Sequence, residues 1–452
     1  MADINLGVGG ANSASGGYDI DNSVKLEADN DERFTRTPSS AGNRKTWTFS
    51  AWVKRTELGA NQILISAADT YLYFGSDDKI HCNFRPASEN FFLSTNRLFR
   101  DTSAWYHIVV QCDTTDSTAA DRAKLYINGV RETSYSNSTY NNMSQNLDTS
   151  MNNTIEHMIG RYSSSDDYRM SGYISEFHLV DGTALTPTSF GEYDDDSGIW
   201  KPKEYTGSYG TNGFYLDFAD ATDLGDDESG NGNDWTEVNI TAADQATDTP
   251  TNNFCTLNPL IPYGYPTTIS EGAVKGVDNS VGLGGAAGTI AVNSGKWYWE
   301  FKSSVSTTIM GIQDIEADTS TSNNAHEIPY TMGVYLLGEY NYAADSTGRN
   351  DGSTSGLIFD ADRRYAVALN LDDDEITYYQ LGSSVGTFSL DGLAGLYVRP
   401  FASCAGTLQW NFGGYTTIGS YSNTDANGYG AFEYTPPSGY YALCSKNLAE
   451  YG

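Results

Sequence analysis

The stretch TWTFSAWVKR, residues 46–55, decides the fold class of this chain. A β-strand places alternate residues on opposite faces. One face then carries Trp47, Phe49, Ala51 and Val53. An aromatic, wholly apolar face of this length predicts a strand in a two-sheet core that buries large rings. Trp52 falls on the opposite face, where loops or a neighbouring segment must cover it.

A second strand of the same kind lies about 250 residues later, in KWYWEFK, 296–302. Here Trp297, Trp299 and Phe301 share one face, and Tyr298 faces the other way. The distance between the two strands predicts two separate β-sandwiches, each with its own aromatic strand.

Between and after these strands lie short alternating runs such as TYLYFGS, IHCNFRP, AWYHIVVQC, RYAVALNLD and TLQWNFGG, separated by Gly, Asn, Asp, Ser or Pro. This spacing is typical of antiparallel sandwiches. Asn128–Gly129 between two apolar runs predicts a type I′ hairpin turn. The corresponding stretch YYQLGSSVG in the second half has no Asn-Gly pair and predicts a longer or irregular turn.

The composition restricts the function classes. The 452 residues include 26 Lys+Arg and 58 Asp+Glu, a net charge of −32. Such a surface repels phosphate backbones and anionic lipids, so nucleic acid and membranes are not expected as partners. Aromatic residues make up 13% of the chain, which excludes a disordered protein.

The cysteines and the N-terminus indicate where the protein folds. The five cysteines are widely spaced and odd in number, which predicts buried free thiols without disulfides. The first residues, MADINLGVGG, have neither a basic region nor an apolar core, so no signal peptide is predicted. We expect synthesis and folding in a cytoplasm.

The changes in composition predict four segments. These are a flexible N-terminal arm (1–22), a first sandwich (23–193), an acidic connector with a docking strand in NGFYLDFA (194–258) and a second sandwich (259–452).

The ordered set TWTFSAWVKR, AWYHIVVQCD, AKLYINGVRE and GYISEFHLVDGTALTP resembles the laminin G / concanavalin A-like lectin-glucanase fold. GKWYWEFK, YAVALNLDDDEITYYQLG, GLYVRPFAS and LQWNFGG resemble a SPRY domain, itself a concanavalin A-like sandwich. The tandem is similar to virion structural proteins of marine tailed phages. This resemblance implies two jelly-roll sandwiches in a virion component that binds glycans or proteins.

Three motifs suggest enzymes, and the sequence argues against each. EADNDE, 27–32, matches the E-x-D-x-x-E of laminarinase-type hydrolases but lacks the apolar spacers of a catalytic strand, so we expect a solvated acidic hairpin. GSSVG, 382–386, matches a nucleophile elbow, but every histidine precedes Ser384 and no helix follows. GLGGAA, 282–287, lacks the strand and helix of a nucleotide loop, so its glycines are expected to form an ordinary loop. We expect no enzymatic activity.

One acidic loop could bind Ca²⁺, which takes six to eight oxygen ligands. In DLGDDESGNGND, 223–234, the ligands would include Asp227, Ser229 and Asn231. The loop has no Glu twelve positions after the first ligand, and a solvated acidic turn is the alternative. No other cofactor is predicted.

The best sequence candidate for a glycan site is LLGEYNYAADS, interpreted as a loop of the second sandwich. Its binding residues would be Tyr340, Asn341, Tyr342 and Asp345. Sugar sites combine aromatic faces with a few polar groups. The alternative is that these tyrosines only pack the loop onto the sandwich.

The sequence therefore favours a virion fibre or appendage protein that binds a host surface glycan or neighbouring virion proteins. The alternatives are a capsid or tail decoration protein that serves assembly alone, and a glycan depolymerase. By analogy with phage fibres we expect a homo-oligomer, with a trimer favoured.

Overall fold

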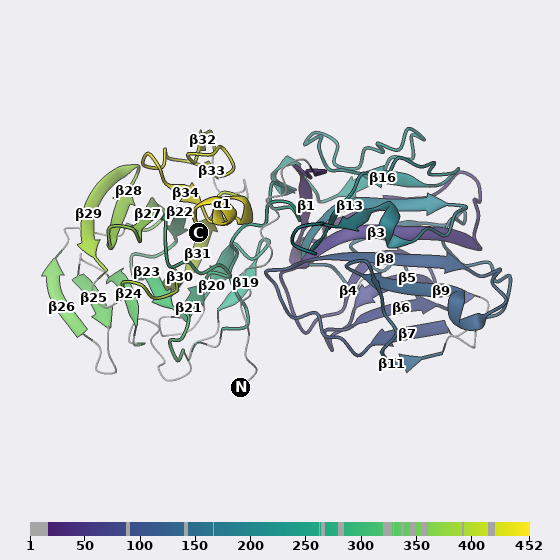
Figure 1. The fold of residues 1–452 in the computed structure, drawn as a ribbon, viewed down its shortest axis with the longest axis horizontal. Coiled ribbons are helices and arrows are strands. Elements are labelled where there is room, and N and C mark those ends of the chain that lie inside the picture. Colours follow the sequence, from purple (N-terminus) through teal and green to yellow (C-terminus); the bar gives the residue numbers. More distant parts are fainter. Residues whose placement is uncertain are drawn as a thin grey trace. The chain divides into compact units, whose positions relative to one another are not determined.

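The computed structural model describes residues 17–452 apart from 87–90, 140–142, 166, 262, 264–266, 279–283, 320–327, 329, 336–338, 344–348, 355–359, 391–392 and 415–420, and apart from the side chains of 335, 339–343 and 349–354. The protein is nearly all-β, with 5% of residues helical and 42% in strands, which confirms the predicted fold class. It divides into two compact units, one ending at Thr251 and the other beginning at Asn252 (Figure 1).

The first unit contains two eight-stranded antiparallel sheets. In spatial order, sheet A contains β10 (Val130–Arg131), β9 (Ala123–Ile127), β8 (Trp105–Asp113), β3 (Thr46–Arg55), β13 (Gly172–Asp181), β1 (Ser23–Leu26) and β18 (Gln245–Ala246), and β16 (Phe214–Leu216) also pairs with β13. Sheet B contains β11 (Tyr135–Ser138), β7 (Phe91–Thr95), β6 (Ile80–Phe84), β5 (Thr70–Phe74), β4 (Gln62–Ala67), β12 (His157–Ile159), β2 (Arg33–Arg36) and β17 (Thr236–Val238).

Strand β3 has the two faces that its sequence predicts. Its apolar face joins the core of the unit through Trp47, Phe49, Ala51 and Val53. On the other face Trp52 is 4% exposed and stacks on His107 of β8, with ring centroids 4.8 Å apart. Trp200 stacks in turn on His107. Because Trp200 belongs to the predicted connector, 194–258, the connector covers this face of the strand.

The connector is an integral part of the first unit. Besides β16, β17 and β18 it supplies most of a hairpin of β14 (Gly191–Tyr193) and β15 (Trp200–Pro202). Two buried ion pairs tie its end to sheet A: Lys25 Nζ lies 2.9 Å from Asp244, and Lys54 Nζ lies 2.7 Å from Asp248. The first unit therefore extends well beyond the predicted end of the first sandwich at residue 193.

The predicted arm is anchored at its C-terminal end. The Tyr18 hydroxyl donates to Glu176, Thr251 Oγ1 accepts from the Ile20 amide, and Ser175 donates to the Asn22 carbonyl. Burial of Ile20 adds an apolar contact. Residues 18–22 are thus fixed to the unit, contrary to a flexible arm over 1–22; residues 1–16 lie outside the described part.

The second unit also has two sheets. The first contains β19 (Thr268–Ser270), β20 (Lys275–Val277), β31 (Thr407–Asn411), β22 (Lys296–Ser303), β27 (Arg364–Asn370), β28 (Glu375–Gln380) and β29 (Ser383–Ser389), with β34 (Tyr441–Ala442) parallel to β22. The other contains β21 (Gly284–Ala287), β30 (Val398–Cys404), β23 (Thr308–Asp314), β24 (Thr331–Tyr335), β25 (Glu339–Ala343) and β26 (Arg349–Thr354). Outside these sheets lie β32 (Asn423–Thr424), β33 (Ala431–Phe432) and α1 (Ser445–Tyr451).

The aromatic strand β22 repeats the arrangement of β3. Its core face contributes Trp297, Trp299 and Phe301. Tyr298 on the other face is 1% exposed, and Phe432 of β33 covers it at 4.9 Å between ring centroids. In both units a later segment of the same unit covers the outer face of the aromatic strand.

The two hairpin turns are alike, against expectation. Asn128 and Gly129 both have positive φ, as a type I′ turn requires. Leu381 and Gly382 also have positive φ and join β28 directly to β29, with Gln380 opposite Ser383. The prediction of a longer or irregular turn was wrong, because strand pairing on both sides holds Leu381 in a conformation that local propensity disfavours.

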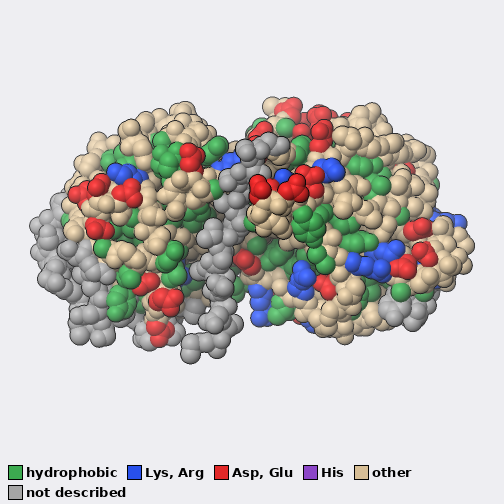
Figure 2. Space-filling model, viewed as in Figure 1, with side chains coloured by type: hydrophobic (Ala, Val, Ile, Leu, Met, Phe, Trp, Pro, Cys, Tyr) green, Lys and Arg blue, Asp and Glu red, His purple; other side chains and the backbone are tan. Residues whose placement is uncertain are grey.

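All five cysteines are free and buried. The short 3₁₀ helices include η1 (Ala28–Asn30), η3 (Ala119–Asp121), η5 (Pro187–Ser189) and η6 (Ala242–Asp244). In the described part of the chain no helix has both the length and the apolar character needed to span a membrane. Acidic side chains are visible on both units beside wide areas of uncharged surface (Figure 2).

Candidate functional site

The residues predicted from LLGEYNYAADS lie mainly in a strand. The backbone of Tyr340, Asn341 and Tyr342 forms part of β25, which pairs with β24 and β26. The interpretation of this stretch as a loop was wrong, because E-Y-N-Y-A pairs on both sides within a sheet. The side chains of these three residues and the whole of Asp345 lie outside the described residues.

The predicted calcium ligands have internal roles. The Asp227 carboxylate accepts four hydrogen bonds, from the amides of Tyr215, Ser229 and Asn233 and from the Ser229 hydroxyl. The Asn231 side-chain amide donates to the carbonyls of Gly210 and Gly213. Donors therefore surround the carboxylate where a cation would need free oxygens. No metal-binding group of three His, Cys, Asp or Glu occurs among the described residues.

The acidic motif at 27–32 buries its two glutamates and exposes Asp29 and Asn30. Glu27 is 5% exposed and Glu32 is 4% exposed. Glu32 accepts hydrogen bonds from the Glu27 amide and from Asn30. Burial raises the pKa of Glu32 to about 7. The expectation of a solvated hairpin was wrong, because β1 and β2 on either side of the motif belong to different sheets and both glutamates are buried. Ser171, just before β13, donates a hydrogen bond to Glu27.

A cluster of aromatic side chains on the outer face of sheet B forms a different candidate site. Leu72 and Phe74 of β5 face the core, so Tyr71 and Tyr73 face outward. On β6, Asn83 stands opposite Tyr71 and His81 opposite Tyr73. We call the following set the tyrosine cluster: Tyr71, Tyr73, His81, Asn83, Phe92, Tyr162 and Tyr168.

The rings of the tyrosine cluster stack in a row across the strands. The centroids of Phe92 and His81 lie 5.4 Å apart, those of His81 and Tyr73 lie 4.7 Å apart, and those of Tyr73 and Tyr168 lie 5.7 Å apart. Each pair is within 23° of parallel. Stacking of this kind on a sheet fixes the rings, so they form a rigid surface.

Two of the tyrosines come from a loop, residues 161–169, whose described residues 161–165 and 167–169 contact the outer face of β4 and β5. Tyr162 lies 4.7 Å from Tyr71 and 6.1 Å from Tyr168 between ring centroids. The Ser66 hydroxyl on β4 donates to the Arg161 carbonyl and accepts from the Ser163 amide. The amide of Met170 donates to the carbonyl of Gly160 and closes the loop.

Tyr168 has a backbone φ of 65°. A bulky residue in the left-handed region costs energy and persists only where the surroundings impose it. Here its ring stacks on Tyr73. The contacts of the Tyr168 side chain therefore hold its backbone in a conformation that is locally unfavourable.

Polar groups lie among the rings. Asn83 donates its side-chain amide to the Tyr71 hydroxyl at 2.8 Å, and burial raises the pKa of Tyr71 to about 12. His81 Nε2 lies 2.9 Å from Asp77 Oδ1. Burial alone would raise the pKa of Asp77, but the hydrogen bonds and charges of His81 and Lys79 together outweigh it, and the pKa is lowered. Among the described residues, Asn83 Oδ1 and His81 Nδ1 have no hydrogen-bond partner.

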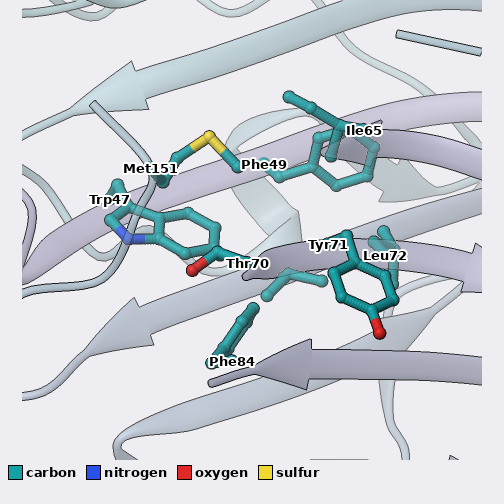
Figure 3. A pocket seen from close by; sticks show the side chains of 9 residues that line it. Trp47, Phe49, Ile65, Thr70, Tyr71, Leu72, Phe84 and Met151 are labelled. Atoms are coloured by element: carbon teal, nitrogen blue, oxygen red, sulfur yellow. The ribbon is translucent and has the colours of Figure 1, made fainter. Parts of the chain in front are cut away.

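The first unit also contains a small internal pocket (Figure 3). It is lined by Trp47, Phe49, Ile65, Thr70, Tyr71, Leu72, Phe84, Val110 and Met151. Most of these side chains belong to the core between the sheets, so the pocket is a gap in core packing. In Figure 3 the Tyr71 hydroxyl points away from Trp47 and Met151.

Sequence reasoning missed the tyrosine cluster, although part of the signal was present. In TYLYFGS, Tyr71 and Tyr73 occupy the face opposite Leu72 and Phe74, which marks an aromatic surface outside the core. The alternation gives no sign that Tyr162 and Tyr168, about 90 residues later, complete that surface.

One family model matches part of the chain. Residues 29–189 match the concanavalin A-like lectin/glucanases superfamily, in its laminin G form. All members of the tyrosine cluster lie within this matched range. No curated protein matches the chain.

Solved structures give weaker similarities. The chain is similar to a TRIM65 PSpry domain (16% identity, TM-score 0.29, 35% of this chain and 89% of that one) and to the SPRY domain of human HERC1 (13%, 0.26, 36% and 99%). It is also similar to a putative carbohydrate-binding protein from Bacteroides ovatus ATCC 8483 (13%, 0.35, 49% and 58%).

Proposed function

We propose that the protein is a non-enzymatic phage virion component that binds a glycan through the tyrosine cluster. The observation that carries this proposal is the row of stacked, half-buried rings on the outer face of sheet B, with phenol hydroxyls and an amide among them. Aromatic rings with a few fixed polar groups suit the alternating apolar patches and hydroxyls of a saccharide.

The scaffold supports such a role. Tyr73 and His81 project from paired strands, so their positions do not depend on a flexible segment. Tyr162 and Tyr168 come from a loop, where binding residues are common. Tyrosine supplies a large contact area at a low cost in side-chain entropy.

The absence of catalysis is part of the proposal. Glu27, Asp29 and Glu32 match a hydrolase motif, and the two glutamates are buried. Ser384 of the G-x-S-x-G match lies in strand β29 instead of a nucleophile elbow. Retaining hydrolysis needs two carboxyls facing a substrate cleft.

The virion location and the homo-oligomer belong to the proposal as well. They rest on the resemblance of the ordered strand set to marine phage structural proteins. A trimer would raise the avidity of weak single contacts by orders of magnitude. Light scattering of the full chain measures the copy number, and immunogold labelling of intact particles tests the location.

The central test is a glycan array with the full chain, followed by affinity measurements on the best ligand. We expect Tyr73→Ala and Tyr162→Ala each to weaken binding roughly tenfold or more, as central aromatic contacts do. Tyr397→Ala, an exposed tyrosine of the second unit, is the matched control and should bind normally.

Three outcomes would change the proposal. If Tyr340→Ala and Tyr342→Ala abolish binding and the cluster variants do not, the site lies in the second unit. If no glycan is bound, the assembly role is the better explanation. If the protein releases reducing ends from host polysaccharide and Glu27→Gln stops it, the protein is an enzyme.

A further inference from the structure

Asp31 lies at the base of the loop that completes the tyrosine cluster. Three arginines converge on its carboxylate: Arg33 Nη1 at 2.6 Å, Arg161 Nη1 at 3.1 Å and Arg169 Nε at 3.2 Å. The chain has 26 basic residues against 58 acidic ones. Three guanidinium groups on one carboxylate are therefore unusual in this protein.

Two of these arginines flank the loop in the sequence. In RYSSSDDYR, 161–169, each terminal Arg stands next to a Tyr. Arg161 and Arg169 contact Asp31, while Tyr162 and Tyr168 contact Tyr71 and Tyr73. One carboxylate thus holds both ends of the loop that carries two rings of the cluster.

The two halves of the loop are held differently. The first half is also fixed to β4, because Ser66 bonds to Arg161 and Ser163, and the Ser163 hydroxyl accepts from the Ala68 amide. The second half is held at Arg169 by Asp31 and at Met170 by the Gly160 carbonyl. Tyr168, which has the strained φ, lies in this second half.

We infer that Asp31 is a positioning residue, whose charge holds loop 161–169 against sheet B so that Tyr168 and Tyr162 complete the tyrosine cluster. The inference about loop position stands on geometry alone, and its consequence for ligand affinity rests on the proposed function. Arg33 and Arg161 donate hydrogen bonds to the Asp31 carboxylate, so these pairs are directional as well as charged. The contact of Arg169 with Asp31 is an ion pair.

The substitution Asp31→Asn removes the negative charge of residue 31 and keeps the size and shape of its side chain. Asp31 has a φ of 57°, a conformation that Asn adopts at least as readily as Asp, so the turn after η1 is kept. The amide retains one oxygen acceptor but loses the ionic attraction to the arginines. Asp29→Asn, in the same turn at an exposed position, is the matched control.

The experiment uses the full chain and two readouts. Amide hydrogen exchange over 161–169 needs no ligand, and we expect faster exchange in Asp31→Asn than in wild type, most in 167–169. The dissociation constant for the best array glycan should rise roughly three- to tenfold, the effect of losing the two ion pairs that hold the loop, those of Asp31 with Arg161 and Arg169. Thermal stability should stay close to wild type, and Asp29→Asn should change neither readout.

Further variants keep the inference falsifiable. If Asp31→Asn does not fold, Arg169→Gln should reproduce the faster exchange, and Arg169→Lys should restore part of the protection. Unchanged exchange in a folded Asp31→Asn, or in Arg169→Gln, would overturn the positioning role. If wild type binds no saccharide, the proposed function fails, while the exchange data still decide what Asp31 does.

Discussion

The indole N–H of Trp200 donates a hydrogen bond to Nδ1 of His107 at 3.0 Å. An indole nitrogen is only a donor, so Nδ1 must be unprotonated. Nε2, 2.9 Å from the Ser50 hydroxyl, then carries the proton of a neutral imidazole. The connector thus covers sheet A through a histidine that must stay uncharged.

This contact predicts an acid-sensitive first unit. Burial lowers the pKa of His107 from 6.5 to about 3. The unfolded chain therefore binds a proton more readily than the folded protein does. The stabilisation of the fold by the neutral ring is complete above pH 6.5 and is lost as the pH falls toward 3. We expect a loss of roughly 3 to 5 kcal/mol across this window from His107. Urea unfolding between pH 8 and pH 4 measures the upper part of it, and an NMR titration of His107 near 6.5 would contradict the prediction.

Glu32 should have the opposite pH dependence. Burial raises its pKa from 4.5 to about 7, so the folded state holds the proton more tightly than the unfolded chain. The contribution of Glu32 to the free energy of unfolding is complete below pH 4.5 and is lost as the pH rises through 7. We expect Glu32→Gln to raise the free energy of unfolding at pH 8, by at most about 3 kcal/mol, and to change it little at pH 4. A Gln variant less stable than wild type at pH 8 would show that the ionised carboxylate is favourable here.

The connector should be essential for folding of the first unit. Asp248 accepts from Lys54 Nζ at 2.7 Å and from the Trp105 indole at 3.0 Å, and all three residues are buried. Asp248→Asn leaves the Lys54 ammonium without its counter-charge, and we expect a loss of about 3 to 5 kcal/mol. Asp196→Asn, an exposed carboxylate of the same segment, should be neutral. Equal stability of the two variants in chemical denaturation would refute the prediction.

Substitution of Tyr168 should affect glycan binding and thermal stability differently. Its φ of 65° is strained for Tyr and is tolerated by Asn. Tyr168→Asn removes the ring contacts with Tyr73 and Tyr162 but relieves a strain of about 1 kcal/mol or more. We expect the melting temperature to change little while glycan affinity falls. A sharp fall in melting temperature would show that the ring is a packing residue.

The cysteines give a chemical test of burial. Burial raises the pKa of Cys82, Cys404 and Cys444 to about 12, so their thiolates are scarce near neutral pH. We expect slow alkylation of the native protein at pH 8 and five modified thiols after denaturation without reductant. Fewer than five, restored by reductant, would reveal a disulfide.

Local alternation was enough to predict the class of fold and the faces of the two aromatic strands. Trp47 and Trp297 are core residues because period-two spacing puts every second side chain on one side of a strand, wherever that strand lies. The Asn128–Gly129 turn was predictable for a similar reason, since positive φ at two successive residues is a local demand.

Only long-range pairing decided which surfaces were covered and where a site could form. Trp52 and Trp200 both stack on His107, Glu32 lies near Asp244, and Tyr73 meets Tyr168 across the outer face of sheet B. These partners are separated by about 95 to 210 residues. Periodicity in the sequence shows on which side of a strand a residue lies. Which segment packs against that side is set by the order of strands in the sheet and by the paths of the loops. Both depend on the whole unit folding together.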